Sequence, residues 1–154
     1  MLVVEEAGMD VLFDDAPPQA TMFCDGGSRG NPGPAASGSV VVAPDGRTIA
    51  QVGVFLGIAT NNVAEWNGLC AGLEAAADHG IKRLAVRMDS ELVVKQIKGV
   101  YRVKHPALKP FFARAKMLLR RFESVDIQHV PRKLNAAADA VVNQVLDREA
   151  AVRR

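Results

Sequence analysis

The sequence lacks the features that would place a protein in or across a membrane. No apolar run approaches the roughly 20 residues that span a bilayer. The N-terminal stretch MLVVEEAGMD has neither a basic flank nor a long apolar segment, so it is not typical of a secretory signal. Cysteine is scarce, because only Cys24 and Cys70 occur and they have no metal-ligand spacing. We therefore expect a cytoplasmic protein with reduced thiols and no membrane partner.

Acidic residues are nearly missing from one long stretch, although the net charge of the chain is only +2. Between Lys95 and Lys133, eleven Lys or Arg residues stand against two acids, Glu123 and Asp126, which gives this span a charge of +9. Such a span is either a solvated helix face or a surface for a phosphate backbone. Clustered cations gain affinity for phosphates by releasing counterions.

Basic residues are absent from the N-terminal segment of the chain. Residues 1–19 contain five acids and no Lys or Arg, and Pro17-Pro18 separates them from the first convincing strand. We expect an acidic, loosely ordered N-terminal extension over 1–19, in which LVV (2–4) and VLF (11–13) could dock locally, and one catalytic domain over 20–150.

The rest of the chain alternates between strand and helix patterns. Apolar and β-branched runs predict strands, and apolar residues recurring at three and four predict helices. The strands are expected at 20–25, 37–44, 47–57, 82–89 and 124–131, and the helices at 61–80, 91–99, 106–122 and 135–151. Three strands followed by alternating helices and strands indicate an α/β (α+β mixed) domain with a mixed sheet.

Two of the predicted strands end in an aspartate, Asp25 and Asp89. The right-handed crossover rule places the fourth strand parallel to the first, so the two carboxylates should lie side by side. Either aspartate alone could simply form a turn or cap a helix. Together they would repel each other unless a cation neutralises them, and carboxylate oxygens suit a hard cation such as Mg²⁺.

Two further acids could join this pair. Glu65 lies four residues before Leu69, on the face of its helix that should pack against the sheet, unless it reaches solvent at the helix start. Asp139 lies among alanines on the last helix, where a single aspartate is most often a surface residue.

Four motifs stand in a fixed order: DGGSRGNPGP, TNNVAEWNGL, MDSELVVKQI and NAAADAVVNQ. In this order and spacing they resemble the type 1 ribonuclease H family, over about residues 20–148. The resemblance implies a ribonuclease H-like fold with a five-stranded mixed sheet in the order 3-2-1-4-5 and helices on both faces. It also implies that the four acids, Asp25, Glu65, Asp89 and Asp139, are the catalytic residues and bind two divalent metal ions.

The implied activity is an endonuclease that hydrolyses the RNA strand of RNA–DNA hybrids and leaves 5′-phosphate and 3′-hydroxyl ends. The expected cofactor is a pair of Mg²⁺ ions, with Mn²⁺ as a possible substitute. The implied substrate contacts are Gly26, Asn31, Thr60, Asn61, Asn62 and Gln96. The asparagines could instead serve in turns and as a helix N-cap, Asn61 or Asn62 being the candidates for the cap. Gly26 and Gly27 are expected to leave room for the duplex.

The sequence departs from the family in two places. Only GVYRVKHPA occupies the gap in which better-known members carry a basic, tryptophan-bearing helix. Tyr101 within it could stack on a sugar, although we expect it in the core. The loop before Asp139 lacks the histidine that assists product release in the family, and Arg132 is the candidate for a stand-in or a phosphate contact.

Two other functions compete with hybrid cleavage. The domain could be a catalytically silent module that binds duplexes, or a nuclease of the same fold that acts on double-stranded RNA. The presence of all four acids favours an enzyme, and we expect it to be a monomer.

Overall fold

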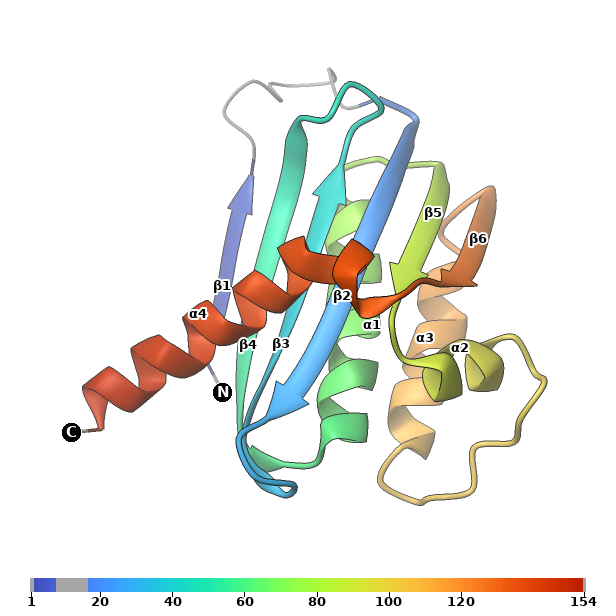
Figure 1. Cartoon of the computed structure of the whole chain (residues 1–154). Coiled ribbons are helices and arrows are strands. Elements are labelled where there is room, and N and C mark those ends of the chain that lie inside the picture. The colour runs from blue at the N-terminus through green and yellow to red at the C-terminus, as the bar shows by residue number, and fades with distance from the viewer. Residues whose placement is uncertain (1, 8–16, 154) are drawn as a thin grey trace.

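A computed structural model describes residues 2–7 and 17–153 of the chain. Its centre is one twisted sheet, flanked by helices on both faces (Figure 1). The strands are β1 (Leu2–Ala7), β2 (Gln19–Ser28), β3 (Gly33–Val42), β4 (Thr48–Ala59), β5 (Arg83–Met88) and β6 (Ser124–His129).

The strand order is β1-β4-β3-β2-β5-β6. Strands β2, β3 and β4 form an antiparallel meander, while β5 is parallel to β2 and to β6. For the five strands that the sequence predicts, this is the order 3-2-1-4-5, so the predicted fold is confirmed. The parallel pair results from the crossover through the first helix, as the handedness rule requires.

The sheet has a sixth strand that the five-stranded expectation did not include. Strand β1 pairs antiparallel with β4, from Leu2 opposite Phe55 to Ala7 opposite Ala50. The run LVV therefore docks on the domain by pairing with the edge of β4, whose backbone groups would otherwise lack strand partners. The run VLF (11–13) lies outside the described residues. The division of the chain at residue 19 stays a prediction.

Helices cover both faces of the sheet, as predicted (Figure 1). Helix α1 (Asn61–Asp78) packs on one face together with α2 (Glu91–Ile97) and α3 (Lys109–Leu119). Helix α4 (Ala136–Val152) follows a short 3₁₀ helix, η1 (Arg132–Asn135), and crosses β2, β3 and β4 on the other face.

The main core lies between α1 and the sheet. Trp66, Leu69 and Leu73 on α1 are fully buried, and so is Met22 on β2. The indole Nε1 of Trp66 donates a hydrogen bond to Gln96 Oε1 at 3.3 Å, so the buried polar group of this ring is satisfied. A smaller apolar cluster lies under α4 and consists of Ala36, Phe55, Val142, Val145 and Leu146.

Helix α1 lies directly on the backbone of β2. A Cβ atom on Gly26 would overlap the backbone of Ala64 and Glu65, and one on Gly68 would lie 2.5 Å from the carbonyl oxygen of Asp25. Glycine at both positions therefore permits a contact that any other residue would prevent. This contact brings Glu65 close to Asp25.

Helix α4 approaches the opposite face with similar closeness. Gly38 on β3 is the register partner of Asp25, and a Cβ atom there would lie 2.7 Å from the carbonyl oxygen of Ala138. The residue after Ala138 is Asp139, so this contact sets how near Asp139 comes to the end of β2.

We expect Gly38→Ala to lower the free energy of unfolding by about 1–3 kcal/mol, because the added methyl group overpacks the α4 interface. Gly27→Ala is the matched control, since its Cβ would meet Val142 at an ordinary 3.9 Å. Urea denaturation of both variants tests this prediction. Equal effects of the two substitutions would show that the close approach of α4 at Gly38 does not matter.

Candidate active site

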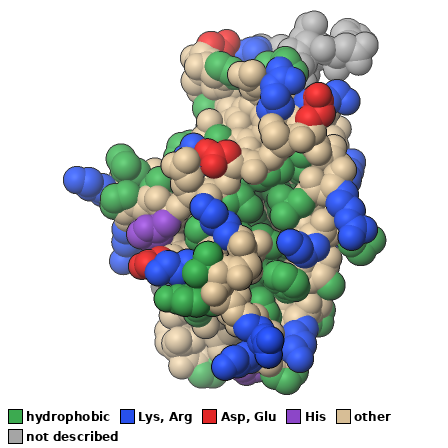
Figure 2. Space-filling view, turned by 90° about the vertical axis from the view of Figure 1, so that its right-hand side faces the viewer, with side chains coloured by type: hydrophobic (Ala, Val, Ile, Leu, Met, Phe, Trp, Pro, Cys, Tyr) green, Lys and Arg blue, Asp and Glu red, His purple; other side chains and the backbone are tan. Residues whose placement is uncertain are grey.

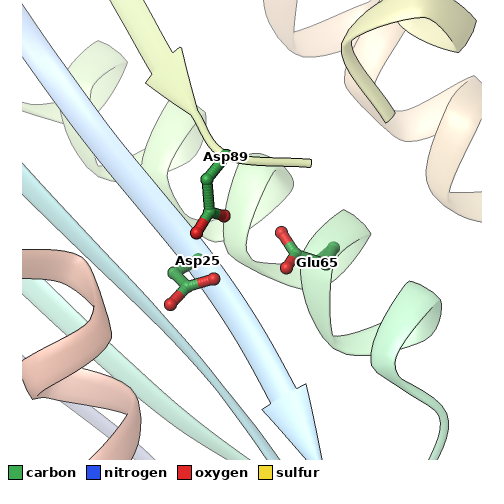
Figure 3. Close-up of side chains that lie close together, drawn as sticks. All are labelled: Asp25, Glu65 and Asp89. Carbon is green, nitrogen blue, oxygen red and sulfur yellow. The ribbon is translucent and has the colours of Figure 1, made fainter. Parts of the chain in front are cut away.

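Three carboxylates converge beside β2 at Asp25, three residues before the strand ends at Ser28 (Figure 3). The sequence interpretation had the strand end at Asp25, whereas β2 continues beyond it. One carboxylate oxygen from each of Asp25, Glu65 and Asp89 lies within 4.8 Å of the other two. Asp25 belongs to β2, Asp89 directly follows β5, and Glu65 lies in the second turn of α1. The parallel pairing of Cys24 with Met88 puts the next residues, Asp25 and Asp89, side by side. The predicted proximity of these two aspartates is therefore confirmed.

Burial and mutual repulsion dominate the electrostatics of this cluster. Burial raises the pKa of Glu65 well above its ordinary value, and the nearby charges of Asp25 and Asp89 raise it further. The pKa of Asp25 is also raised, again by burial first and then by Asp89. Within the described part of the chain, no Lys or Arg forms an ion pair with any of the three.

The donor atoms of the cluster fit a hard divalent cation. Oε2 of Glu65 is buried and has no hydrogen-bond partner, which is costly for a carboxylate oxygen unless a cation or a proton satisfies it. Asp25 is only 7% exposed, and its Oδ1 accepts a hydrogen bond from the amide of Gly26 at 2.9 Å. This bond fixes the direction of the Asp25 side chain. Oxygen-only ligands held in this way are typical of Mg²⁺ and Mn²⁺ sites.

Asp139 reaches the same cavity from the first turn of α4. The cavity has a volume of about 380 Å³, and Asp25, Glu65, Asp89 and Asp139 all line it. Asp139 is not part of the tight group of three. Its Oδ2 accepts a hydrogen bond of 3.3 Å from Asn143, one turn further along the helix. The structure thus brings all four predicted acids to one cavity, with Asp139 on the side of α4.

A buried asparagine ties the start of α4 to β2. Asn135 is 1% exposed, and its Nδ2 donates a hydrogen bond of 2.9 Å to the carbonyl oxygen of Cys24, the residue before Asp25. The sequence motif contains this asparagine four residues before Asp139, but the pattern does not reveal what the side chain contacts. The structure shows that it anchors the helix that carries Asp139.

The predicted polar contacts form a hydrogen-bonded group at the rim. Oδ1 of Asn61 accepts from the amide of Ser28 at 2.9 Å and from its hydroxyl at 3.0 Å. Oδ1 of Asn31 in turn accepts from the amide of Asn61 at 3.1 Å. Asn61 lines the cavity, so this group holds the glycine-rich loop against the start of α1.

The N-cap of α1 is Thr60 and neither Asn61 nor Asn62, so that part of the sequence interpretation was wrong. Oγ1 of Thr60 accepts from the amide of Val63 at 3.2 Å. The hydroxyl reaches this amide because Thr60 has the extended backbone that an N-cap requires. Asn62 is exposed at the start of the helix.

Two of the predicted substrate contacts have structural roles. Gln96 is 6% exposed; its Oε1 accepts from Trp66 and its Nε2 donates to the carbonyl oxygen of Arg102 at 3.5 Å. Its amide is engaged in the interior of the protein, and its role as a substrate contact stays a prediction. Gly26 makes room for α1, whereas the sequence interpretation had it making room for a duplex.

Two arginines line the cavity beside the acids, Arg29 and Arg132. Arg132 lies at the start of η1, and its place at the cavity agrees with the expectation from the sequence. Arg29 was missed, although it stands inside the motif DGGSRGNPGP. The signal was present, because a basic side chain beside a predicted phosphate site is itself a candidate ligand.

The side of the molecule formed by β6, α2 and α3 carries many basic side chains. Figure 2 shows more Lys and Arg than Asp and Glu on it. Three of the eleven basic residues between 95 and 133 form ion pairs, namely Lys95 with Glu91, Arg114 with Glu74 and Arg121 with Asp78. Others are exposed there or at the cavity: Lys98, Arg102, Lys104, Lys109, Arg120, Arg132 and Lys133.

Tyr101 lies in this basic region and is 48% exposed. The expectation that it fills the core was wrong. It follows the end of α2, and its ring lies 5.1 Å from Nζ of Lys95. In this contact the ammonium group of Lys95 lies over the face of the ring and keeps the ring at the surface.

Comparison with known proteins gives a consistent result. Residues 23–145 match the family described as Reverse transcriptase-like. Ribonuclease HI of Halobacterium salinarum is 49% identical over 125 residues, which are 81% of this chain and 63% of that protein. The chain thus spans less than two thirds of this curated relative.

Solved structures agree with this similarity. The N-terminal RNase H domain of Rv2228c from Mycobacterium tuberculosis superimposes with a TM-score of 0.85 at 42% identity, covering 90% of this chain and 100% of that one. LC11-RNase H1, solved in complex with an RNA/DNA hybrid, gives a TM-score of 0.80 at 39% identity, covering 85% of this chain and 99% of that one.

The fold and the acidic cavity define a nuclease-type domain of the reverse transcriptase-like class. The chain belongs to the type 1 ribonuclease H family. Among the residues that the structure describes, no helix is both long and apolar enough to cross a membrane.

We expect Glu65→Gln to stabilise the metal-free protein at neutral pH and to have little effect at acidic pH. The folded-state pKa of Glu65 is raised above its ordinary value of 4.5. The contribution of Glu65 to stability is therefore complete below pH 4.5 and is lost as the pH rises through the raised pKa. Glutamine stays uncharged, so the variant does not suffer this loss. The effect is measured by thermal unfolding in the presence of a chelator, from below pH 4.5 up through neutral pH.

In the metal-free state at neutral pH, Glu65→Gln should have the higher Tm. Addition of Mg²⁺ should reverse this order, because it raises the Tm of the wild-type protein more than that of the variant. Glu123→Gln is the control, because Glu123 is an exposed acid outside the cavity. If Glu123→Gln shows the same pH profile as Glu65→Gln, the assignment of the effect to the cluster is wrong.

Proposed function

We propose that this chain is an endonuclease that hydrolyses the RNA strand of RNA–DNA hybrids and leaves 5′-phosphate and 3′-hydroxyl ends. The observation that carries the proposal is the convergence of Asp25, Glu65 and Asp89, with Asp139 in the same cavity. A partly buried group of like charges without basic partners costs folding energy, and the binding of divalent metal ions would offset that cost.

The four acids would hold two Mg²⁺ ions, for which Mn²⁺ can substitute. By family resemblance, Asp25 would serve both ions, Asp89 and Glu65 would serve one, and Asp139 would serve the other. When bound, such a pair activates a water molecule and stabilises the departing 3′ oxygen. The protein contributes rigid placement, since the ligands come from β2, the end of β5 and two helices anchored on the sheet.

The substrate class is supported by LC11-RNase H1, which was solved with an RNA/DNA hybrid. A protein distinguishes RNA from DNA by contacts to the 2′-hydroxyl across a wide, shallow minor groove. Here Asn31, Asn61 and Asn62, with the backbone at Gly26, would make these contacts, and Thr60 would hold a phosphate of the DNA strand. The exposed cations between Lys98 and Lys133 supply attraction for the phosphate backbones.

We further propose that the protein acts as a monomer in the cytoplasm. All four acids and both cavity arginines belong to one chain, so a second copy is not needed to complete the site. Cys24 and Cys70 are free and buried, which suits a reducing compartment.

Asp25→Asn should reduce hybrid cleavage roughly a thousandfold or more, because losing a shared metal ligand removes several kcal/mol of transition-state stabilisation. The assay uses end-labelled hybrid, double-stranded RNA and double-stranded DNA, each with Mg²⁺, Mn²⁺ or chelator. Asp45→Asn is the control, since Asp45 is exposed in the β3–β4 turn.

Cleavage of the hybrid that persists in chelator would disprove the metal-dependent mechanism. Binding without cleavage by the wild-type protein would favour the silent duplex-binding module. Preferential cleavage of double-stranded RNA would show that double-stranded RNA, and not the hybrid, is the substrate.

We expect Arg132→Ala to slow turnover about tenfold, the loss of a single charged contact to phosphate. Arg132 lines the cavity without being a candidate metal ligand, so the rise in Tm on adding Mg²⁺ should stay unchanged. Arg132→Lys keeps the charge and should recover part of the rate. Unchanged turnover in Arg132→Ala would remove this residue from the mechanism.

A further inference from the structure

The cavity extends beyond the four acids, along the first turns of α4. This extension is lined by Ser28 at the end of β2, by Arg29 in the loop that follows, and by Val142, Asn143 and Leu146 on α4. The extension is therefore a groove whose lining combines two apolar side chains, Val142 and Leu146, with the basic Arg29. Its neighbour in the cavity is the candidate metal site.

Arg29 is held in this groove by an acid on α4. Its Nη2 lies 2.6 Å from Oδ1 of Asp147, eight residues beyond Asp139 on the same helix. The two side chains are 45% and 70% exposed. An ion pair this open to water contributes little to stability and is easily exchanged for another anion.

We propose that Arg29 is a phosphate ligand for the RNA strand of the substrate, next to the phosphate that is cut. Asp147 is its resting partner, which keeps the guanidinium at the cavity until a phosphate replaces the carboxylate. This inference rests on the proposed hybrid-cleaving function and adds a specific residue to it.

Charge balance in the cavity is the first argument for this role. Four carboxylates and two divalent cations carry no net charge together, so the phosphates of the entering strand stay uncompensated. Arg29 and Arg132 are the basic residues among the described lining of the cavity. Arg132 belongs to η1 and Arg29 to the loop after β2, so each can serve a different phosphate.

The chemistry of the side chain is the second argument. A guanidinium has five N–H donors in a planar fork, and its pair with Asp147 engages one of its nitrogens. Arginine forks match the oxygens of a phosphate in paired hydrogen bonds. Arg29 can thus turn to a phosphate without losing a buried contact.

The competing explanation is that the ion pair simply ties the loop after β2 to α4. The two explanations differ in what happens when only Asp147 is changed. If the pair is structural, Asp147→Asn and Arg29→Ala should have the same effect. If Arg29 binds phosphate, Asp147→Asn should bind the hybrid no less tightly than the parent, because a competing anion has gone.

The experiment measures equilibrium binding of a labelled RNA–DNA hybrid over a range of salt concentrations. All variants carry Asp25→Asn so that the hybrid is not cut, and wild-type cleavage is assayed in parallel. Arg29→Ala should weaken binding about tenfold and reduce the slope of log affinity against log salt by about one, the value for a single phosphate contact. Arg29→Lys should restore the slope and part of the affinity.

Two further variants serve as controls. Arg83→Ala removes an arginine of nearly the same exposure, 44%, that is paired with Glu123 and lies outside both the cavity and the basic span, so it should leave the affinity unchanged. The exchange of Arg29→Asp with Asp147→Arg rebuilds the ion pair in reverse, and in our proposal it does not recover binding.

Recovery of binding by the reversed pair would overturn the proposal and establish the structural tie. Equal losses in Arg29→Ala and Arg83→Ala would overturn it as well. If the wild-type protein binds hybrid but does not cut it, the proposed function fails, while the salt slopes still decide the role of Arg29.

Discussion

The close contact of the neighbouring strands β2 and β3 with one helix on each face of the sheet is the constraint on which the rest of the structure depends. Helix α1 lies against Gly26, and α4 lies against Gly38, the register partner of Asp25. In both contacts helix backbone approaches strand backbone, α1 at β2 itself and α4 at the residue of β3 that pairs with Asp25. Because glycine has no side chain to separate these elements, Asp25, Glu65 and Asp139 can reach one cavity although they lie far apart in the sequence.

This arrangement places several carboxylates close together, and the rest of the fold compensates for the free energy that their burial and repulsion cost. The raised pKa values of Asp25 and Glu65 show that burial and repulsion oppose ionisation. The apolar core around Trp66 and the anchor from Asn135 to the carbonyl of Cys24 keep the carboxylates in place despite that repulsion. A site held in this way needs little rearrangement when cations arrive, because the chain has already fixed its ligands.

Sequence patterns predicted the elements and the acids, but not every contact around them. Alternating apolar residues located the strands of 20–129, and the crossover rule paired Asp25 with Asp89. The pattern misjudged Tyr101, because an aromatic ring in a short gap could face either way. It also did not reveal the hydrogen bond between Gln96 and Trp66, since a glutamine that satisfies a buried indole looks the same in the sequence as one at the surface. Strand β1 was uncertain because its partner, the edge of β4, is about fifty residues away in the chain.

The sequence by itself determined the order of strands and helices, the identity of the four acids and the family. These follow from local periodicity and from motifs whose residues lie close together along the chain. Only the tertiary structure decided that Gly26 and Gly38 serve helix packing, that Asn135 anchors α4, and that Arg29 meets Asp147 beside the cavity. Such contacts depend on distances between residues far apart in sequence, and these distances are set by how helices and sheet pack together.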